Sequence, residues 1–363
     1  MTRIVYSSDI FEMQRYGGIS RYFVELAQQI SCLEAFEVKV SSTIHINSYL
    51  KNSNLNSGFY LPFSPHRLRA DNLIRHVNKF HSTSITSKQP FDIRHETFYK
   101  GGVNSLSARK TVTTVYDLTR EKFTPNWHGF EAKQKSLGQA DAIICISNST
   151  KDDLLNFYKV NPEKLSVIHL GVSNIFKNDL SLVKNFRQSQ QLLYVGTRSG
   201  YKDFKTLLLA FSKSSILRNN LKVLVLGSKF TIDEEKLMES LGIRNNFNQK
   251  SAGDQNLVAA FKNSIALIIT STYEGFGLTV LEAMLSGCPV VSTGGGSLGE
   301  VAGGFDVNFE PSEPESLTEA IISVVDKTLP NNSSAKKAQK YAEAFTWEQT
   351  AFKTRDVYTN LLI

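Results

Sequence analysis

At 363 residues the chain has room for about two domains of ordinary size, and its hydrophobic content of 41% is ample for packed cores. This composition excludes an intrinsically disordered chain, and no apolar stretch approaches the length of a membrane span. The net charge of +7 favours an anionic partner, which could be nucleic acid, a membrane surface or a phosphorylated substrate.

The amino-terminal residues, Met1 to Asp9, are predicted to form a first strand and lack the apolar core of a signal peptide. We therefore expect a cytoplasmic protein. Cys32, Cys145 and Cys288 lie in apolar contexts without C-x-x-C spacing. This predicts reduced core cysteines and neither a disulfide framework nor a zinc site.

Short apolar runs typical of buried strands alternate with helical patterns along the whole chain, which predicts parallel sheets. Between the two series of runs, residues 173–190 are polar and without periodicity, as expected of an interdomain linker. The predicted strands lie at residues 4–7, 37–41, 110–116, 142–146 and 164–169, and then at 191–196, 221–227, 265–269 and 289–292.

Gly17 and Gly18 follow the first predicted strand and precede a helical pattern. Such glycines either satisfy the backbone geometry of a turn or let the backbone approach a ligand, and both interpretations stay open. Asp117 ends a predicted strand, where an aspartate is as often a helix cap as a ligand contact. A lone histidine such as His95 is more often a satisfied polar residue than a functional one.

A basic helical pattern lies between Leu68 and Phe80. It fits either an ordinary core-facing helix with a solvated basic face or docking to anionic lipid. The apolar positions are Leu73, Val77 and Phe80, and the basic ones are Arg69, Arg75, His76 and Lys79.

Arg198 and Lys202 follow the strand that ends at Gly196, and Lys202 is predicted to open a helix. Two cations near a helix N-terminus at the carboxyl end of a strand indicate a phosphate site, because open parallel sheets bind ligands there. The alternative is two solvated surface cations. The helix is expected to bury Phe204, Leu207, Leu208 and Phe211.

Glu274 and Glu282 are eight positions apart in residues 273–290, directly after a predicted buried strand. Gly275 and Gly277 let the backbone approach a ligand, and the N–H groups that open the next helix favour anions and hydroxyls. Each carboxylate is an acceptor that can take paired hydroxyl hydrogens from a sugar or ribose ring. The alternative is a pair of solvated helix glutamates.

The run Gly294 to Gly299 satisfies G-x-G-x-x-G, the fingerprint of dinucleotide-binding loops. The residues that follow, Glu300 to Gly304, leave no room for the long helix that the fingerprint requires, so we reject a nicotinamide site. The chain contains no D-x-D sequence and no His, Asp or Glu cluster with metal-ligand spacing. We therefore expect basic groups and helix N-termini to neutralise a bound diphosphate without a metal ion.

The E-x7-E spacing of Glu274 and Glu282, followed by Gly-x-Pro-Val-Val, resembles retaining glycosyltransferases of family 4, group 1 enzymes of the bacterial polysaccharide biosynthesis type. The segment from Tyr194 to Asp203 is similar to the diphosphate-binding segment of this family, with Asp203 where Asn is commoner. Residues 116–125 look like the His-Asp segment of the family, with Tyr116 in place of the usual histidine.

The resemblance implies an α/β protein with the GT-B fold, in which two Rossmann-like domains of parallel sheets face each other across a cleft. Residues 1–175 would form the N-terminal acceptor-binding domain and 190–345 the C-terminal nucleotide-sugar-binding domain. Residues 346–363 would form a helix that crosses back to the N-terminal domain, capped by Thr346 and with an apolar stripe of Trp347, Ala351 and Val357.

The resemblance also implies roles for individual residues. Glu274 would hold the sugar hydroxyls and stabilise a cation-like anomeric carbon, Glu282 would grip the ribose diol, and Asp117 and His95 would be the other catalytic residues. The implied donor-binding residues are Arg198, Lys202, Glu282, Gly17, Gly18, Gly277, Leu278 and Thr279.

The implied reaction is transfer of a hexose, with retention of anomeric configuration, from a nucleotide diphosphate sugar to a glycan or lipid-linked acceptor. UDP-glucose is the first expectation for the donor and GDP-mannose the second. The nucleotide sugar is a substrate, so no cofactor and no metal are expected. No nucleic-acid partner is expected. Peripheral contact with anionic lipid on the inner face of the plasma membrane stays an alternative. An isomerase such as a UDP-sugar 2-epimerase and a non-catalytic nucleotide-sugar-binding module stay open as rivals.

Overall fold

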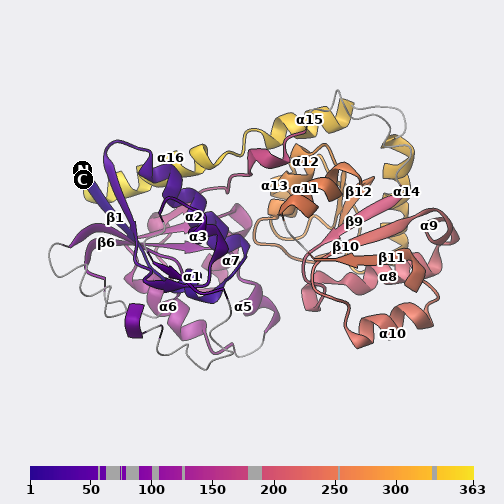
Figure 1. The fold of residues 1–363 in the computed structure, drawn as a ribbon, viewed down its shortest axis with the longest axis horizontal. Coiled ribbons are helices and arrows are strands. Elements are labelled where there is room, and N and C mark those ends of the chain that lie inside the picture. Colours follow the sequence, from indigo (N-terminus) through magenta and orange to yellow (C-terminus); the bar gives the residue numbers. More distant parts are fainter. Residues whose placement is uncertain are drawn as a thin grey trace. The chain divides into compact units, whose positions relative to one another are not determined.

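A computed structural model of the chain describes residues 1–55, 58–62, 74, 76–78, 90–99, 106–124, 127–178, 190–251, 254–328 and 333–363 (Figure 1). It divides into two compact units. The first comprises Met1–Gly171 and Thr346–Ile363, and the second comprises Val172–Phe345. Most of the expected linker lies outside the described residues, but its beginning packs on the second unit, where Phe176 is fully buried.

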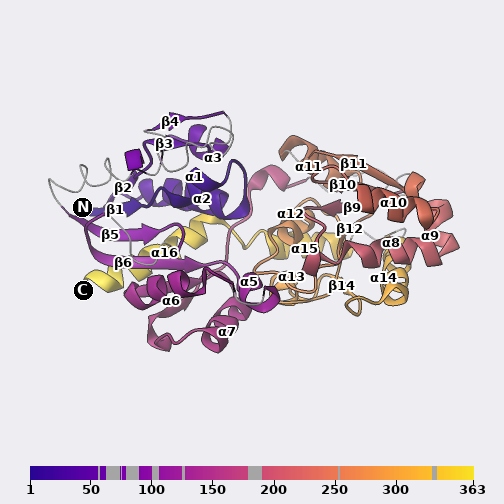
Figure 2. The same cartoon turned by 90° about the horizontal axis from the view of Figure 1, so that it is seen from below.

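The first unit is a parallel sheet with helices on both faces (Figure 2). Its strands are β1 (Thr2–Tyr6), β2 (Phe36–Val40), β5 (Phe91–Glu96), β6 (Ala108–Val115), β7 (Ala142–Cys145) and β8 (Leu165–Val167), with β3 (Ile44–His45) and β4 (Phe59–Tyr60) in a separate pair. Its helices are α1 (Asp9–Met13), α2 (Gly18–Ser31), α3 (Ser48–Lys51), α5 (Thr119–Phe123), α6 (Phe130–Gln139), α7 (Asn148–Phe157) and α16 (Trp347–Leu362).

The second unit repeats this architecture. Its strands are β9 (Gln191–Val195), β10 (Lys222–Leu226), β11 (Phe247–Lys250), β12 (Ala266–Ile269), β13 (Val290–Ser292) and β14 (Val307–Asn308). Its helices are α8 (Phe204–Lys213), α9 (Ser215–Asn220), α10 (Ile232–Ser240), α11 (Asp254–Lys262), α12 (Leu278–Leu285), α13 (Leu298–Ala302), α14 (Pro314–Thr328) and α15 (Ser333–Ala342).

All nine strands predicted from the sequence are present. Five observed strands were not predicted: the two-residue strands β3, β4 and β14, and the longer β5 and β11. In β5 the buried residues Phe91, Ile93 and His95 alternate with the charged Asp92 and Arg94, so no continuous apolar run marks the strand. β11 lies at the edge of its sheet and is mostly polar, which hides it for the same reason.

The order of the strands creates one special position in each sheet. The first sheet runs β2-β1-β5-β6-β7-β8 and the second β11-β10-β9-β12-β13-β14. In each, the first strand of the unit therefore lies between the second strand and a later one, and the order reverses between β1 and β5 and between β9 and β12. Open parallel sheets bind ligands outside the carboxyl ends of the strands at such a reversal.

The core of the second unit forms where the central strands meet the flanking helices. Val223 of β10 and Ile268 of β12 are buried together with Leu207 and Phe211 of α8. Burying each such side chain contributes about 1.5–3 kcal/mol, and the helical spacing of the α8 residues is the one predicted from the sequence. Among the described residues, no helix combines the length and apolar character that crossing a bilayer requires.

Cys145 and Cys288 are buried and free, and burial raises the pKa of each thiol to about 12. The expectation of reduced core residues is confirmed for these two. For Cys32 only the expected core position is wrong, since this cysteine is free but exposed at the C-cap of α2.

The C-terminal helix α16 packs against α2 within the first unit (Figure 1). Its N-cap is as predicted, since Thr346 Oγ1 accepts a hydrogen bond from the N–H of Gln349 at 3.1 Å. The predicted stripe is only partly correct, because Val357 is half-buried. The buried positions are Trp347, Thr350, Ala351, Thr354 and Tyr358, three of which are polar residue types that an apolar pattern does not detect.

The hydroxyl of Tyr358 is a testable anchor of α16. It lies 3.1 Å from the Tyr6 hydroxyl and 2.6 Å from His95 Nδ1, and the tyrosine is fully buried. Tyr358→Phe leaves both partners without this bond, so we expect the free energy of unfolding to fall by about 1–3 kcal/mol. Urea denaturation measures the change, with Tyr16→Phe as the exposed control in the same unit. Equal stability of the two variants would contradict the anchoring role.

Candidate functional site

Lys202 and Glu274 form an ion pair where the strand order of the second sheet reverses. Lys202 follows β9 and Glu274 follows β12, the two strands that flank the reversal. Lys202 Nζ lies 2.6 Å from Glu274 Oε1, and the two side chains are 19% and 21% exposed. The predicted strand and loop pattern placed both residues at this edge, and the structure brings them into direct contact.

Backbone contacts hold the two loops together. Thr270 Oγ1 donates to the carbonyl of Lys202 at 2.6 Å, and the N–H of Thr272 donates to the carbonyl of Tyr201 at 2.9 Å. Lys202 does not open α8 as predicted. It ends a short 3-10 turn, Gly200–Lys202, and α8 begins two residues later.

The ion pair keeps Lys202 charged. Burial disfavours the ammonium form, but the Glu274 carboxylate and its hydrogen bond outweigh that effect and raise the pKa of Lys202 above its ordinary value. Lys202 is therefore a cation at neutral pH. Because both side chains retain some exposure, a ligand that offers an anion to Lys202 and hydroxyls to Glu274 can exchange for the contact between them.

The loop after β13 positions the backbone of Glu274. Gly296 forms an isolated parallel bridge with Glu274, and the N–H and hydroxyl of Ser297 both donate to the Glu274 carbonyl at 3.0 Å. A Cβ on Gly296 would lie 2.4 Å from that carbonyl oxygen, and one on Gly295 would lie 2.2 Å from the carbonyl oxygen of Thr272. Close packing of the two loops thus explains why glycines occupy these positions. The helix that follows, α13, is too short for a dinucleotide-binding fingerprint, which agrees with our rejection of a nicotinamide site.

Helix α12 begins beside Glu274. Its N-cap, Gly277, has φ of +88°, a left-handed conformation that other residues rarely adopt. Leu278 and Thr279 open the helix, so their N–H groups belong to its positive end. Glu282 is only 4% exposed, which contradicts the alternative of a solvated helix glutamate.

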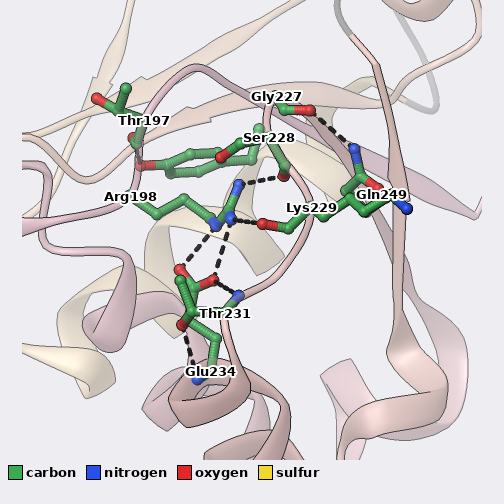
Figure 3. A network of polar contacts seen from close by, with 9 residues as sticks. Thr197, Arg198, Gly227, Ser228, Lys229, Thr231, Glu234 and Gln249 are labelled. Carbon is green, nitrogen blue, oxygen red and sulfur yellow. Dashed lines mark hydrogen bonds and ion pairs between the residues drawn. The ribbon is translucent and has the colours of Figure 1, made fainter. Parts of the chain in front are cut away.

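Arg198 lies in a network of its own, shown in Figure 3. Its guanidinium donates to both carboxylate oxygens of Glu234, at 2.7 and 3.0 Å. It also donates to the carbonyls of Ser228 and Lys229, at 3.0 and 2.8 Å. Four of the five guanidinium N–H groups are thus engaged, and the side chain is 3% exposed. The alternative of a solvated surface cation is wrong for Arg198.

Glu234 connects Arg198 to helix α10. Thr231 and Glu234 form a capping box, in which each side chain accepts from the backbone N–H of the other residue. Burial disfavours the charge of Glu234, but hydrogen bonds from Arg198 and Thr231 outweigh this and lower its pKa. Glu234 was not predicted as a partner of Arg198, because it lies 36 residues away in the chain and its only local signal is the capping box.

Asp203, where the family resemblance leads us to expect Asn, is the N-cap of α8. Its φ of +44° is left-handed, a conformation that Asn and Asp tolerate better than other side chains. Its carboxylate accepts from the hydroxyls of Thr206 and Ser312 at 2.7 and 2.8 Å. The substitution therefore preserves both the backbone conformation and the acceptor.

In the first unit, Gly17 caps α2 and Gly18 opens it. Neither has a left-handed φ, so a tight turn does not explain them. A Cβ on Gly17 would meet the Gln14 side chain at 2.3 Å, whereas one on Gly18 would meet no atom within 4 Å. Gly18 thus has no packing requirement within the described residues, and its proposed contact with a ligand stays a prediction.

Asp117 makes the kind of contact expected of a cap. Its Oδ1 accepts from the N–H of Thr119, the first residue of α5, at 3.0 Å, and its carbonyl accepts from Lys133 Nζ at 3.0 Å. Tyr116, where the family resemblance leads us to expect a histidine, is 6% exposed and packs against the rings of Tyr22 and Phe23. Burial raises its pKa, so the phenol stays protonated.

His95 lies inside the first unit, and its side chain is not exposed. Nδ1 bonds Tyr358 at 2.6 Å, and Nε2 lies 2.8 Å from Thr114 Oγ1. The rings of Tyr6 and Phe23 pack beside it. Burial lowers the pKa of His95 to about 3. These contacts contradict a catalytic role that requires touching a substrate, and they support the alternative of a satisfied core histidine.

Of the predicted residues in the second unit, the structure groups Lys202, Glu274 and the start of α12, and it places Arg198 in the separate network with Glu234. Within the described part of the chain, no three His, Cys, Asp or Glu side chains are grouped as ligands for a metal ion.

Comparison with solved structures establishes the class of fold. The chain superimposes on Anabaena Alr3699/HepE in complex with UDP and glucose with a TM-score of 0.77 and 18% identity, covering 99% of this chain and 100% of the other. Sucrose-phosphate synthase from Thermosynechococcus elongatus gives 0.75 at 17% identity, covering 100% and 99%. The protein therefore has the GT-B fold of glycosyltransferases.

Two family models match the sequence: Glycosyltransferase Family 4 over residues 16–174, and Glycosyl transferases group 1 over residues 181–345. The chain therefore belongs to the group 1, family 4 glycosyltransferases.

Among curated relatives, MMP alpha-(1->4)-mannosyltransferase of Mycolicibacterium hassiacum is 28% identical over 66% of this chain and 59% of its own length. O-antigen chain mannosyltransferase B of Escherichia coli is 22% identical over 69% and 70%. D-inositol 3-phosphate glycosyltransferase of Streptomyces avermitilis is 22% identical over 94% and 83%. The matched region thus spans less than two thirds of the first of these relatives.

The network around Arg198 can be tested with two neighbouring glutamates of α10. Glu234→Gln leaves a buried guanidinium without its counter-charge, and we expect the free energy of unfolding to fall by about 3 kcal/mol. Glu235 pairs with Arg244 at side chains that are 36% and 40% exposed, so Glu235→Gln should cost less than about 1 kcal/mol. Denaturant unfolding measures both, and similar losses would show that the Arg198 network does not order this part of the unit.

The burial of His95 predicts a dependence of stability on pH. The folded state leaves His95 unprotonated down to about pH 3, whereas an unfolded histidine binds a proton near pH 6.5. This residue should therefore lower the free energy of unfolding as pH falls from 6.5 towards 3, by about 1.4 kcal/mol per pH unit. In His95→Asn that part of the slope should disappear, while the exposed control His128→Asn should keep it. An unchanged slope in His95→Asn would mean that folded His95 takes up protons readily.

Proposed function

We propose that this protein is a retaining hexosyltransferase that uses a nucleotide diphosphate sugar and acts on a glycan or lipid-linked acceptor in polysaccharide biosynthesis. The observation that carries the proposal is the Lys202–Glu274 pair, a cation and an acid 2.6 Å apart at the ligand-binding position of a parallel sheet. Membership of the family supports the reaction class.

The choice of donor rests on the relatives. UDP-glucose is the first proposal, supported by the likeness in fold to Anabaena HepE, which has been solved with UDP-glucose. GDP-mannose is the second, supported by relatives that are named mannosyltransferases.

In the proposed reaction, the bond between the anomeric carbon and the diphosphate oxygen breaks, and its electron pair goes to the leaving diphosphate. Lys202 Nζ and the N–H groups that open α12 stabilise the negative charge that develops there. Glu274 exchanges its contact with Lys202 for the sugar hydroxyls and stabilises the cation-like anomeric carbon. The acceptor oxygen bonds to that carbon on the face from which the diphosphate leaves, and its proton passes to a departing phosphate oxygen.

The remaining assignments follow from position. Glu282 is proposed to bind the ribose diol, about one turn into α12 from the loop that holds Glu274. Arg198 keeps one N–H group that no described residue accepts, and this group is proposed to reach a phosphate oxygen. Roles for Gly17, Gly18 and Asp117 of the first unit rest on the family resemblance.

Metal independence and location are also proposals. Lys202 and the helix N-terminus supply the positive charge that a divalent ion supplies elsewhere, so transfer is proposed to proceed without metal. The basic segment proposed for contact with anionic lipid, Leu68 to Phe80, lies mostly outside the described residues. Its described part includes Ile74 and Asn78, which are both buried.

The experiment compares Glu274→Gln with Glu239→Gln, an exposed glutamate on α10. Removal of the Glu274 charge should lower kcat about 10²–10³-fold, because an electrostatic contact made in the transition state is lost. Binding of the nucleotide, measured by thermal shift with UDP and GDP, should survive. Assays contain excess EDTA, and wild-type turnover should persist.

Three outcomes would contradict the proposal. Full activity of Glu274→Gln would exclude its role, and loss of wild-type turnover in EDTA would exclude metal independence. Consumption of donor to an isomerised sugar with no acceptor present would identify an epimerase instead of a transferase.

A further inference from the structure

A cavity of about 560 Å³ opens on the first unit between α5, α6 and α7. Its volume lies in the range of small-molecule sites. Aromatic side chains of Trp127, Phe130 and Phe157 line it together with the carboxylates of Glu121 and Glu131. None of the described residues that line it is a lysine or an arginine, although the chain as a whole carries a net charge of +7.

The aromatic rings of the cavity are held in place from outside it. Phe130 stacks on Tyr158 with ring centroids 4.5 Å apart and planes 15° from parallel. The Trp127 ring folds over Gly129, where a Cβ would lie 2.2 Å from a ring atom. Phe130 and Phe157 nevertheless remain 38% and 37% exposed. Fixed and partly exposed aromatic rings are a surface prepared for a ligand with an apolar face.

Glu121 presents a fixed acceptor to the cavity. Its Oε1 accepts from Lys133 Nζ at 2.7 Å and from the Tyr158 hydroxyl at 2.6 Å. The Glu121 and Lys133 side chains are each 2% exposed. No described residue donates to Oε2, so this second oxygen keeps its hydrogen-bonding capacity. A buried ion pair is weak support for stability by itself, and here it orients a carboxylate.

Rings beside uncommitted carboxylate oxygens fit one class of ligand. A pyranose offers an apolar C–H face that packs on aromatic rings and hydroxyl groups that donate to carboxylates. Phosphates and other anions are disfavoured, because the cavity has two acidic side chains, Glu121 and Glu131, and the described lining offers no lysine or arginine beside His128. The nucleotide part of a donor therefore does not belong here.

We propose that this cavity binds a neutral saccharide unit of the acceptor. That the bound saccharide belongs to the acceptor rests on the proposed glycosyl transfer. The binding of sugar itself can be measured without any turnover.

The chain offers a direct reporter. It contains two tryptophans, of which Trp347 on α16 is 5% exposed and Trp127 at the cavity is partly exposed. In a Trp347→Phe variant, Trp127 is the only tryptophan left in the sequence, so all tryptophan fluorescence comes from it. Titration with maltose, mannobiose or chitobiose should give a saturable change in emission with at least one of them. Glucuronic acid should give none, because its carboxylate meets Glu121 and Glu131.

Phe157→Ala in the same background tests the cavity itself. Loss of one stacking ring should weaken saccharide binding about three- to tenfold. Phe352→Ala is the matched control, since Phe352 is a 39% exposed phenylalanine of the first unit that lies on α16. In the wild-type background, Phe157→Ala should raise the acceptor KM by a similar factor and leave the donor KM unchanged.

The two proposals fail in different ways. If no neutral disaccharide changes Trp127 emission up to its solubility limit, or if Phe157→Ala binds as tightly as the control, the cavity proposal is overturned whether or not the protein transfers sugar. If saccharide binds at Trp127 and is weakened by Phe157→Ala while no donor is turned over, the saccharide site stands and the transferase proposal falls.

Discussion

The contact between Lys202 and Glu274 depends on the strand order of the second sheet. The two residues are 72 positions apart in the chain, and they meet because β9 and β12 are neighbours at the point where the order reverses. If β12 were not the neighbour of β9 in the sheet, Lys202 and Glu274 would be separated. The desolvation cost of each charge is offset by the other, so the pair persists in a partly buried place where a ligand can exchange for it.

The surroundings of this pair are rigid for identifiable reasons. Gly295 and Gly296 let the loop after β13 lie directly on the backbone of Glu274, and hydrogen bonds from Thr270 and Thr272 bind the loop after β12 to that after β9. A second set of contacts involves Arg198, whose guanidinium hydrogen-bonds both the loop after β10 and Glu234 in the first turn of α10 (Figure 3). Such preorganisation suits the stabilisation of charge in a transition state, since the groups need not rearrange during the reaction.

Buried polar groups serve two different purposes in the first unit. His95 and Tyr358 bond each other inside the core, where both nitrogens of the imidazole are satisfied and the helix α16 is fastened to β5. Glu121 is buried to a similar extent, but the described residues bond only one of its carboxylate oxygens, and it borders a cavity lined by aromatic rings. Complete satisfaction indicates a structural role, and an uncommitted acceptor beside a cavity indicates a ligand.

Local patterns in the sequence determined the alternation of strands and helices, the buried face of α8, the cap at Thr346 and the loop positions of Lys202 and Glu274, because each depends on residues close in the chain. Tertiary structure alone decided that His95 is buried and that Glu234 pairs with the Arg198 guanidinium. It also decided that Thr354 and Tyr358 belong to the buried face of α16. Burial and charge pairing depend on which strands and helices become neighbours. That choice is made by packing of the whole unit, and residue spacing along the chain does not encode it.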